Sequence, residues 1–280
     1  QADEKAHRTR VVVIEGGHSA EREVSLKSGK GVANALAEAG MEVVQLDISA
    51  PDAVGRLQEG GFDVAFLALH GGLGEDGSVQ GLLQVLGIPY TGSGVRASAT
   101  AMDKWEAKHS YAREGLSAPV GLRLTCLDDD VLDAVDDAVG FPCMLKPTDG
   151  GSSVGLTRID SKEDLRRFAL EHPSEATDVL VERYVDGDVF TVGVLGNDQL
   201  AVLPPLWLDF DGECDYEAKN GATGRLRHVV PAPNLSPAEA LELQEQARTA
   251  HLALGCRGVS RSDFIRDRDG QFLILETNTL

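Results

Sequence analysis

Residues 261–278 read RSDFIRDRDGQFLILETN, with the dipeptide Asp269-Gly270 between two runs that contain apolar residues. Asp-Gly is a strong signal for a two-residue turn between antiparallel strands. A turn centred there pairs Arg268 with Gln271. We therefore predict that this stretch forms a β-hairpin.

The register of this hairpin brings two carboxylates together, because it places Asp263 opposite Glu276. Side chains alternate between the two faces of a sheet, so Arg261 and Asn278 lie on the same face as this pair. Facing carboxylates repel unless a cation lies between them, and Mg²⁺ binds carboxylate oxygens while leaving positions for water and phosphate. We therefore predict a Mg²⁺ site beside an arginine that can meet phosphate. The alternative is a plain hairpin with a solvated acidic pair.

The chain has 280 residues, of which 42% are hydrophobic and 25% charged, as is typical of a soluble globular protein. Its net charge of −19 argues against nucleic acid and anionic membrane as partners, since both need a basic surface. Residues 1–10 contain no signal peptide and no window reaches eighteen apolar residues, so we expect a cytoplasmic protein. The four cysteines form no C-x-x-C pair, which predicts neither a zinc site nor a disulfide framework.

Residues 11–90 alternate between strand and helix patterns, which predicts a parallel α/β sheet. Three domains are expected, at 1–92, 93–183 and 184–280. Strands are expected at 11–14, 41–48, 62–69, 143–146, 154–159, 179–184, 190–195 and 200–206. A single helix is expected over 97–114, another opens at Ser161, and another opens at Ser236 with a capping box. The polar excursion at 209–228 has the length of a lid.

A Gly/Ser loop with a lysine at its entry spans residues 146–155. Gly150 and Gly151 let backbone N–H groups turn toward an anion, and Lys146 adds a compact positive charge for phosphate. A plain hairpin loop is the alternative. Together with a downstream Mg²⁺ site, the loop favours a nucleoside triphosphate site.

Two further loops follow strands of the N-terminal domain, at 16–21 and 70–78. Ligands of parallel sheets bind beyond the carboxyl ends of the strands, so both loops are expected to open on one crevice. Glu21 can hold a substrate ammonium group there or stabilise a helix N-terminus, and His70 can contact a ligand or be structural. The first loop lacks the G-x-G-x-x-G spacing of a dinucleotide site.

Seven segments resemble the D-alanine:D-alanine ligases, in order and over nearly the whole chain. They are Gly16 to Ser25, His70 to Gly77, Tyr90 to Gly94, Met102-Asp103-Lys104, Lys146 to Gly155, Asp215 to Lys219, and Arg261-x-Asp263 with Glu276-x-Asn278. The resemblance implies a three-domain ATP-grasp fold, with an N-terminal α/β substrate-binding domain and two domains that hold ATP.

The resemblance also implies roles for individual residues. Asp263, Glu276 and Asn278 would bind two Mg²⁺ ions, with Mn²⁺ as a substitute. Glu21, Ser152 and Arg261 would be catalytic, Arg261 by stabilising the acyl phosphate and the tetrahedral intermediate. The residues expected to bind substrate are Glu21, His70, Lys219 and Asn220. Those expected to contact ATP are Lys104, Lys146, Gly151, Ser152, Ser153, Glu182, Asp188 and Lys219, with Glu182 at the adenine amino group.

The implied reaction serves the synthesis of peptidoglycan precursors. A D-alanine carboxylate would take the γ-phosphoryl group of ATP, and the amine of a second D-alanine would displace phosphate. The implied partners are these small molecules and a second copy of the chain in a homodimer.

Four features depart from the family pattern. Asn220 replaces a tyrosine, which bears on the second substrate, and Val189 stands at the ribose-binding position, where the neighbouring Asp188 is expected to substitute. Glu15 occupies a usually apolar place. The sequence stops at Leu280, before the segment that binds the second substrate's carboxylate, so an incomplete acceptor site is expected. The alternatives are a ligase with D-lactate or D-serine as acceptor and a catalytically impaired ATP-binding paralogue.

Overall fold

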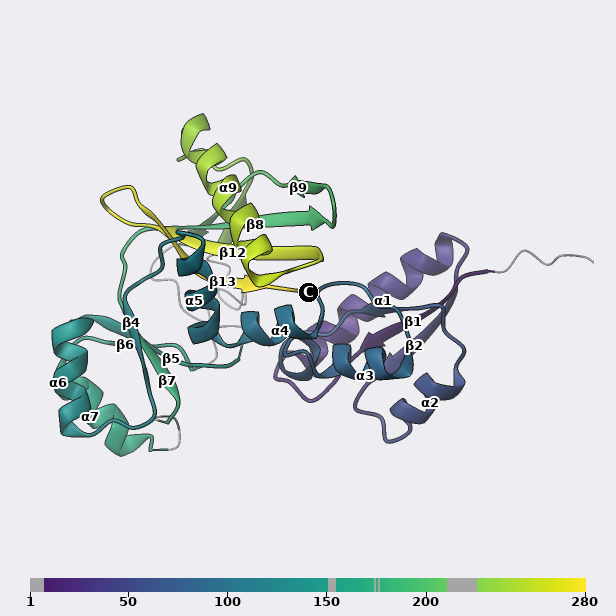
Figure 1. The fold of residues 1–280 in the computed structure, drawn as a ribbon, viewed down its shortest axis with the longest axis horizontal. Coiled ribbons are helices and arrows are strands. Elements are labelled where there is room, and N and C mark those ends of the chain that lie inside the picture. The colour runs from purple at the N-terminus through teal and green to yellow at the C-terminus, as the bar shows by residue number, and fades with distance from the viewer. Residues whose placement is uncertain (1–7, 151–154, 174, 176, 211–225) are drawn as a thin grey trace, which may run out of the picture. The chain divides into compact units, whose positions relative to one another are not determined.

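The computed structural model describes residues 8–150, 155–173, 175, 177–210 and 226–280. The chain divides into two compact units, one formed by the residues up to Ala99 together with Thr279 and Leu280, the other by Thr100–Asn278. Figure 1 shows the helices and strands along the chain. Among the described residues, no helix combines the length and apolarity that crossing a bilayer requires.

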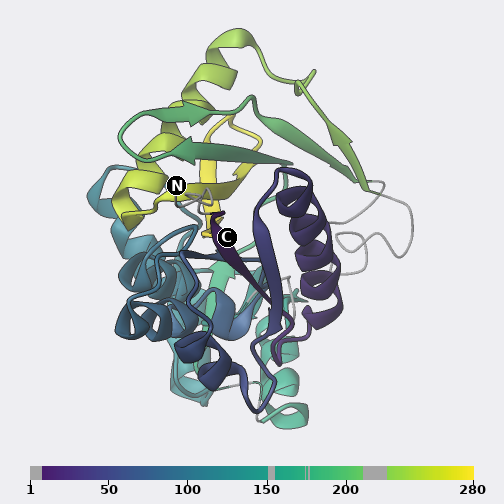
Figure 2. The same ribbon diagram turned by 90° about the vertical axis from the view of Figure 1, so that its right-hand side faces the viewer.

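The first unit contains the predicted parallel sheet, whose strand order is β2-β1-β3. Its strands are β1 (Arg10–Glu15), β2 (Glu42–Asp47) and β3 (Val64–Leu67). The accompanying helices are α1 (Arg22–Glu38), α2 (Ala53–Glu59), the 3₁₀ helix η1 (Gly72–Gly74) and α3 (Ser78–Leu86). Figure 2 shows α1, in dark purple, along the strands.

The core of the first unit includes the last residue of the sequence. Val12 and Ile14 are fully buried and pack with Leu83 in one apolar cluster, to which Leu280 adds its side chain. Leu280 also lies against Gly92, where an added Cβ would approach its Cδ2 to 2.9 Å. The chain therefore returns to the first unit after β13.

The second unit contains two sheets. The first is antiparallel with the strand order β4-β7-β5-β6. Its strands are β4 (Gly121–Leu124), β5 (Cys143–Pro147), β6 (Thr157–Ile159) and β7 (Val179–Arg183). Its helices are α6 (Asp129–Ala138) and α7 (Lys162–Glu171). Ser161 caps α7 as predicted, since its hydroxyl accepts a hydrogen bond from the N–H of Asp164.

The single helix predicted over 97–114 is two helices, α4 (Val95–Met102) and α5 (Lys104–Arg113). Asp103 separates them because its backbone is extended and its carboxylate accepts hydrogen bonds from the N–H groups of Trp105 and Glu106, both at 3.0 Å. An acidic N-cap of this kind starts a new helix. Lys104 is therefore the first residue of α5.

The second sheet has the strand order β11-β10-β8-β12-β13, with β9 on β8. Its elements are β8 (Asp188–Gly196), β9 (Leu200–Val202), β10 (Leu206–Phe210), β11 (Leu226–Val229), α9 (Pro237–Leu254), β12 (Gly258–Arg266) and β13 (Phe272–Asn278). The strand predicted over 200–206 is thus split. The prediction of an excursion without regular structure over 209–228 is wrong at both ends, because the strands β10 and β11 extend into it and pair with each other. The middle of the excursion lies outside the described residues.

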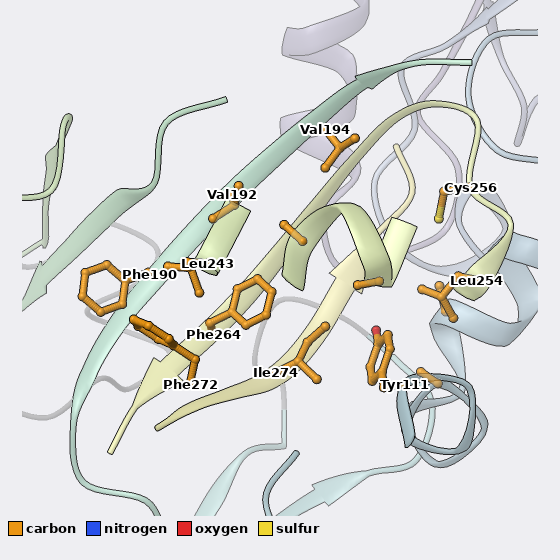
Figure 3. Close-up of a cluster of buried hydrophobic side chains, with 14 of the residues drawn as sticks. Tyr111, Phe190, Val192, Val194, Leu243, Leu254, Cys256, Phe264, Phe272 and Ile274 are labelled. Atoms are coloured by element: carbon orange, nitrogen blue, oxygen red, sulfur yellow. The ribbon is translucent and has the colours of Figure 1, made fainter. Parts of the chain in front are cut away.

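Helix α9 begins as predicted, with Ser236 as N-cap and a capping box completed by Glu239. It packs on β8, β12 and β13. Figure 3 shows the resulting core, where Phe190, Phe264 and Phe272 from the strands gather near Leu243 of the helix and Tyr111 of α5 closes one end. This core supports the hairpin from its α9 side.

Candidate functional site

The hairpin formed by β12 and β13 pairs Asp263 with Glu276 and Arg261 with Asn278, as predicted. Phe264, the next residue along β12, is fully buried in the core that the sheet forms with α9. Asp263 therefore lies on the face away from α9, as does Ile265, which packs in a different apolar cluster. The pairing of the two carboxylates is confirmed.

The turn of the hairpin differs from the prediction. Arg268 is not paired with Gln271, because Gln271 accepts a hydrogen bond from the N–H of Asp267 at 3.0 Å and a three-residue loop, 268–270, intervenes. The Asp267 side chain stabilises this wider loop by accepting hydrogen bonds from the N–H groups of Asp269 and Gln271. Gly270 adopts the left-handed φ of +85° that such a loop requires.

A β-bulge compensates for the longer loop. Phe264 pairs with Ile274, whereas Asp263 pairs with Glu276, so Leu275 is an extra residue on β13. A bulge sets two residues of one strand against one of its partner. The one-residue change that the loop introduces is thereby cancelled before the acidic pair.

Asp263 is only 4% exposed and its nearest described cation is Arg261, whose Nη2 donates to Oδ2 at 3.3 Å. The Arg261 Nε lies 3.2 Å from Oδ1, but Oδ1 has no hydrogen-bond partner among the described residues, and neither has the buried Nδ2 of Asn278. A buried carboxylate oxygen without a hydrogen bond is costly unless a cation meets it. The residues present therefore fit a hard divalent cation.

The donor set is small. In the part of the chain that the structure describes, no three His, Cys, Asp or Glu side chains gather at a possible metal site. A cation at the hairpin would rest on two carboxylates, the amide oxygen of Asn278 and non-protein oxygens. That is the kind of site that Mg²⁺ forms with substrate phosphates.

Lys104 connects the hairpin to the glycine loop. Its Nζ donates to the carbonyl oxygen of Gly150, and its backbone N–H donates to the carbonyl oxygen of Thr148 at 3.0 Å. Burial lowers the pKa of Lys104, and the negative charge of Glu276 opposes this shift. The structure thus brings Lys104, the start of the glycine loop and the acidic hairpin together within the second unit.

Glu182 lies on β7 at 4% exposure, and Lys146 and Lys108 form ion pairs with its two carboxylate oxygens. Burial alone would raise the pKa of Glu182, but the two lysines more than offset it, so the pKa lies below its ordinary value. Lys108 was not among the site residues predicted from the sequence. The sequence did contain a signal for its role, because Lys108 follows Lys104 by four residues on one helix and the two side chains therefore share a face.

Asp188 was expected to substitute at the ribose. In the structure its Oδ2 accepts a hydrogen bond from Arg266 at 2.7 Å, across the pair of strands β8 and β12. Arg266 donates as well to the carbonyl oxygen of Asn234 at 2.9 Å. Val189 is buried at 6% exposure.

The two predicted loops of the first unit lie side by side. The hydroxyl of Ser19 donates to the carbonyl oxygen of His70 at 2.6 Å, and the His70 Nε2 lies 3.0 Å from the Ser28 hydroxyl. The Glu21 carboxylate lies beside Gly71, where an added Cβ would approach Oε2 to 2.6 Å. Glu21 and His70 are therefore neighbours in the folded unit.

Some predicted site residues cannot be placed. The structure leaves them outside the described residues: Gly151, Ser152, Ser153, Lys219 and Asn220. None of the three cysteines in the described ranges forms a disulfide; Cys143 and Cys256 are buried and Cys126 is exposed.

Comparison with known proteins identifies relatives over nearly the whole chain. Residues 123–280 match the family model for the D-ala D-ala ligase C-terminus, and residues 52–93 match that for the N-terminus. A D-alanine–D-alanine ligase of Desulforudis audaxviator is 44% identical over 277 residues, covering 97% of this chain and 88% of the relative. One from Halorhodospira halophila is 42% identical, with coverages of 97% and 86%.

A solved structure shares the fold. It is that of D-alanine–D-alanine ligase from Bacillus anthracis complexed with ATP, which is 30% identical and superposes with a TM-score of 0.79. The match covers 97% of this chain and 86% of that chain.

Proposed function

Because the chain belongs to the D-alanine–D-alanine ligase family, its reaction is the ATP-dependent joining of two D-alanines, and we propose that phosphoryl transfer takes place at the Asp263–Glu276 hairpin. The observation that carries this proposal is the pair of facing carboxylates beside Lys104, of which Asp263 is buried and Glu276 half-buried. Two carboxylates that face each other across paired strands repel unless a cation lies between them, and Mg²⁺ is the cation that accompanies ATP.

The metal proposal assigns two Mg²⁺ ions, replaceable by Mn²⁺, to Asp263, Glu276 and Asn278. When bound, the ions neutralise the phosphate oxygens and the charge that develops during transfer. The Oδ1 of Asp263 is the strongest support, because no hydrogen bond of the described residues satisfies it and its ion-pair partner Arg261 is half-exposed. Asp263 and Glu276 sit on paired strands, so their separation is set by the sheet.

We assign Lys104 and Lys146 to the phosphates of ATP. Lys146 precedes the glycine loop and forms an ion pair with Glu182, and Lys104 donates to the carbonyl oxygen of Gly150 in that loop. The charge of Glu182 also acts on Lys104. Gly151, Ser152 and Ser153 would continue that loop, and Lys219 would approach from the lid. Glu182 is proposed to contact the adenine amino group, and Asp188 the ribose.

The substrate roles belong to other residues. Arg261, with a half-exposed side chain beside Asp263, is proposed to stabilise the acyl phosphate and the tetrahedral oxyanion. Glu21 is proposed to hold the ammonium group of the first D-alanine, and His70 to lie near its carboxyl end. Ser152 would orient the groups around Glu21, and Asn220 would act on the choice of acceptor.

These residues define a two-step reaction. A D-alanine carboxylate oxygen attacks the γ-phosphorus, ADP leaves, and D-alanyl phosphate forms. The amine of the second D-alanine then attacks the carbonyl carbon, phosphate leaves, and the amine loses a proton. The dipeptide feeds peptidoglycan synthesis.

The organisation of the protein is part of the proposal. The three sheets fall within the ranges 1–92, 93–183 and 184–280, which we propose as the three domains. A homodimer is proposed from the family resemblance, and sedimentation velocity tests it. A cytoplasmic site is proposed because the reaction consumes ATP.

The test is ADP release by the purified chain with ATP, Mg²⁺ and D-alanine, with D-alanyl-D-alanine detected by mass spectrometry. Parallel reactions replace the second D-alanine with D-lactate or D-serine. Dipeptide formation with D-alanine supports the proposal. ADP release only with another acceptor would reassign the substrate, and nucleotide binding without any ADP release would reassign the chain to a nucleotide-binding paralogue.

A further inference from the structure

A line of three buried hydroxyl groups lies on the reverse face of the acidic hairpin. Tyr111 donates from its hydroxyl to Oγ1 of Thr277 at 2.9 Å, and that oxygen lies 2.8 Å from the Ser262 hydroxyl. Tyr111 and Ser262 are 0% exposed and Thr277 is 4% exposed. None of the three has a role in the reaction described above.

The place of these residues in the sequence links them to the site. Thr277 stands between Glu276 and Asn278 on β13, and Ser262 stands between Arg261 and Asp263 on β12. Ser262 and Thr277 are themselves a cross-strand pair. Because adjacent side chains of a strand point to opposite faces, their hydroxyls meet behind the groups that face the substrate.

The Ser262–Thr277 pair lies one position beyond the Asp263–Glu276 pair, which borders the β-bulge. If the register of Phe264 and Ile274 continued without the bulge, Asp263 would face Leu275 and Glu276 would face Ser262. The carboxylate of Glu276 would then be opposite a residue of the buried α9 face. The Ser262–Thr277 hydrogen bond exists only in the register that sets Asp263 against Glu276, so it favours the observed position of the bulge.

Tyr111 adds a second connection. It lies on α5, two helical turns after Lys104. Its bond to Thr277 therefore ties the helix that begins with Lys104 to the strand that carries Glu276. The charges of Lys104 and Glu276 interact in the structure.

Resting on the proposed function, we propose that Tyr111, Thr277 and Ser262 form a positioning network that fixes the metal-binding carboxylates relative to one another and to Lys104. The hydroxyls do not touch the substrate or the metal. They act by fixing the register of β12 and β13 and the position of α5. Loss of such support behind metal ligands weakens metal affinity by about 10- to 100-fold.

The test compares Thr277→Val, which removes the hydroxyl and keeps the shape, with Thr277→Ser, which keeps the hydroxyl. Mn²⁺ binding to the full chain saturated with a nonhydrolysable ATP analogue is measured by electron paramagnetic resonance. Thr277→Val is expected to weaken Mn²⁺ binding by about 10-fold or more, and Thr277→Ser by no more than about two-fold. Tyr111→Phe, which removes one oxygen, is expected to act as Thr277→Val does.

Ser260→Ala is the matched control. Ser260 lies two residues before Ser262 on the same face of β12, and its hydroxyl lies 2.7 Å from Nδ1 of His251 in the same core. This variant removes a buried hydrogen bond without touching the hairpin pair. It is expected to lower the melting temperature and to leave Mn²⁺ affinity unchanged.

Equal Mn²⁺ affinities in Thr277→Val and the wild type would overturn the inference, as would a comparable loss in Ser260→Ala. If neither Thr277→Val nor Tyr111→Phe folds, the network is a folding requirement and the positioning role is rejected. Failure of the wild type to bind Mn²⁺ would instead refute the proposed metal site, which keeps the two failures distinct.

Discussion

Asp263 and Glu276 face each other across β12 and β13, and the register of the hairpin changes by one residue immediately beyond them. Both are held by the sheet and not by a flexible loop. Their geometry is therefore fixed before any substrate binds, which is what a site for phosphoryl transfer requires.

Replacement of Asp263 by Asn removes the charge while keeping the shape. We expect the rate of ADP release to fall by at least about 100-fold, because Asp263, a buried acid whose Oδ1 accepts no hydrogen bond from the described residues, is the group proposed to hold the cation. The melting temperature is not expected to fall, since the buried charge is lost together with its desolvation cost. Asp186→Asn, at an exposed acid that pairs with Arg268 of the hairpin loop, is the control and should retain full activity.

Glu15 ends β1 as a buried acid at 8% exposure, and its carboxylate accepts hydrogen bonds from Gln45. It lies over Gly29 of α1, where an added Cβ would come within 1.9 Å of Oε2. Gly29→Ala is therefore expected to destabilise the fold by about 1–3 kcal/mol, as overpacking does. The measurement is unfolding in urea.

Gly31 of the same helix provides the comparison, because an added Cβ there meets nothing within 4 Å. Gly31→Ala is expected to stabilise the protein by about 0.5–1 kcal/mol through the helix propensity of alanine. Equal effects of the two substitutions would contradict the close approach of α1 and Glu15.

Lys108 shares the carboxylate of Glu182 with Lys146. Lys108→Met leaves a buried acid with one cation instead of two, and we expect a loss of about 3 kcal/mol in the free energy of unfolding at pH 7. The triple variant Lys108→Met/Lys146→Met/Glu182→Leu should recover most of that loss, because no charge of the cluster is then left without a partner. A triple variant no more stable than the single one would show that Lys108 acts by packing alone.

His251 is buried at 1% exposure, and burial lowers its pKa. The unfolded chain then takes up a proton at this residue at a higher pH than the folded chain does. The contribution of His251 to stability is therefore fully present above the pKa of the unfolded chain, about 6.5, and is lost as the pH falls below it.

We expect the free energy of unfolding to decrease between pH 7 and pH 5.5, and His251→Gln to flatten that decrease. Denaturant titrations at several pH values provide the measurement. An identical slope in His251→Gln would assign the pH dependence to other groups.

The sequence predicted the pairing of Asp263 with Glu276 for a reason that was only partly right. The dipeptide Asp269-Gly270 indicated a two-residue turn, but hydrogen bonds to the Asp267 side chain stabilise a longer loop. The bulge at Leu275 then restores the register. Two irregularities that cancel leave no trace in the period-two pattern, so the sequence could not reveal either.

Local sequence signals predicted the helix caps well, but they did not predict contacts between segments that are far apart in the chain. The capping box of α9 and the cap of α7 depend on residues three apart, and both are present. The ion pairs of Glu182 with Lys108 and Lys146 join segments far apart in the chain, and local pattern does not encode them. The cap at Asp103 was a local signal that the helical pattern around it concealed.

The return of Leu280 to the first unit has a practical consequence for dissecting this protein. A recombinant fragment that stops at Ala99 would omit a leucine that completes its own apolar cluster over Gly92. The vacated space would leave part of that cluster facing solvent. Grafting the last two residues behind the fragment through a short linker is the direct way to restore it.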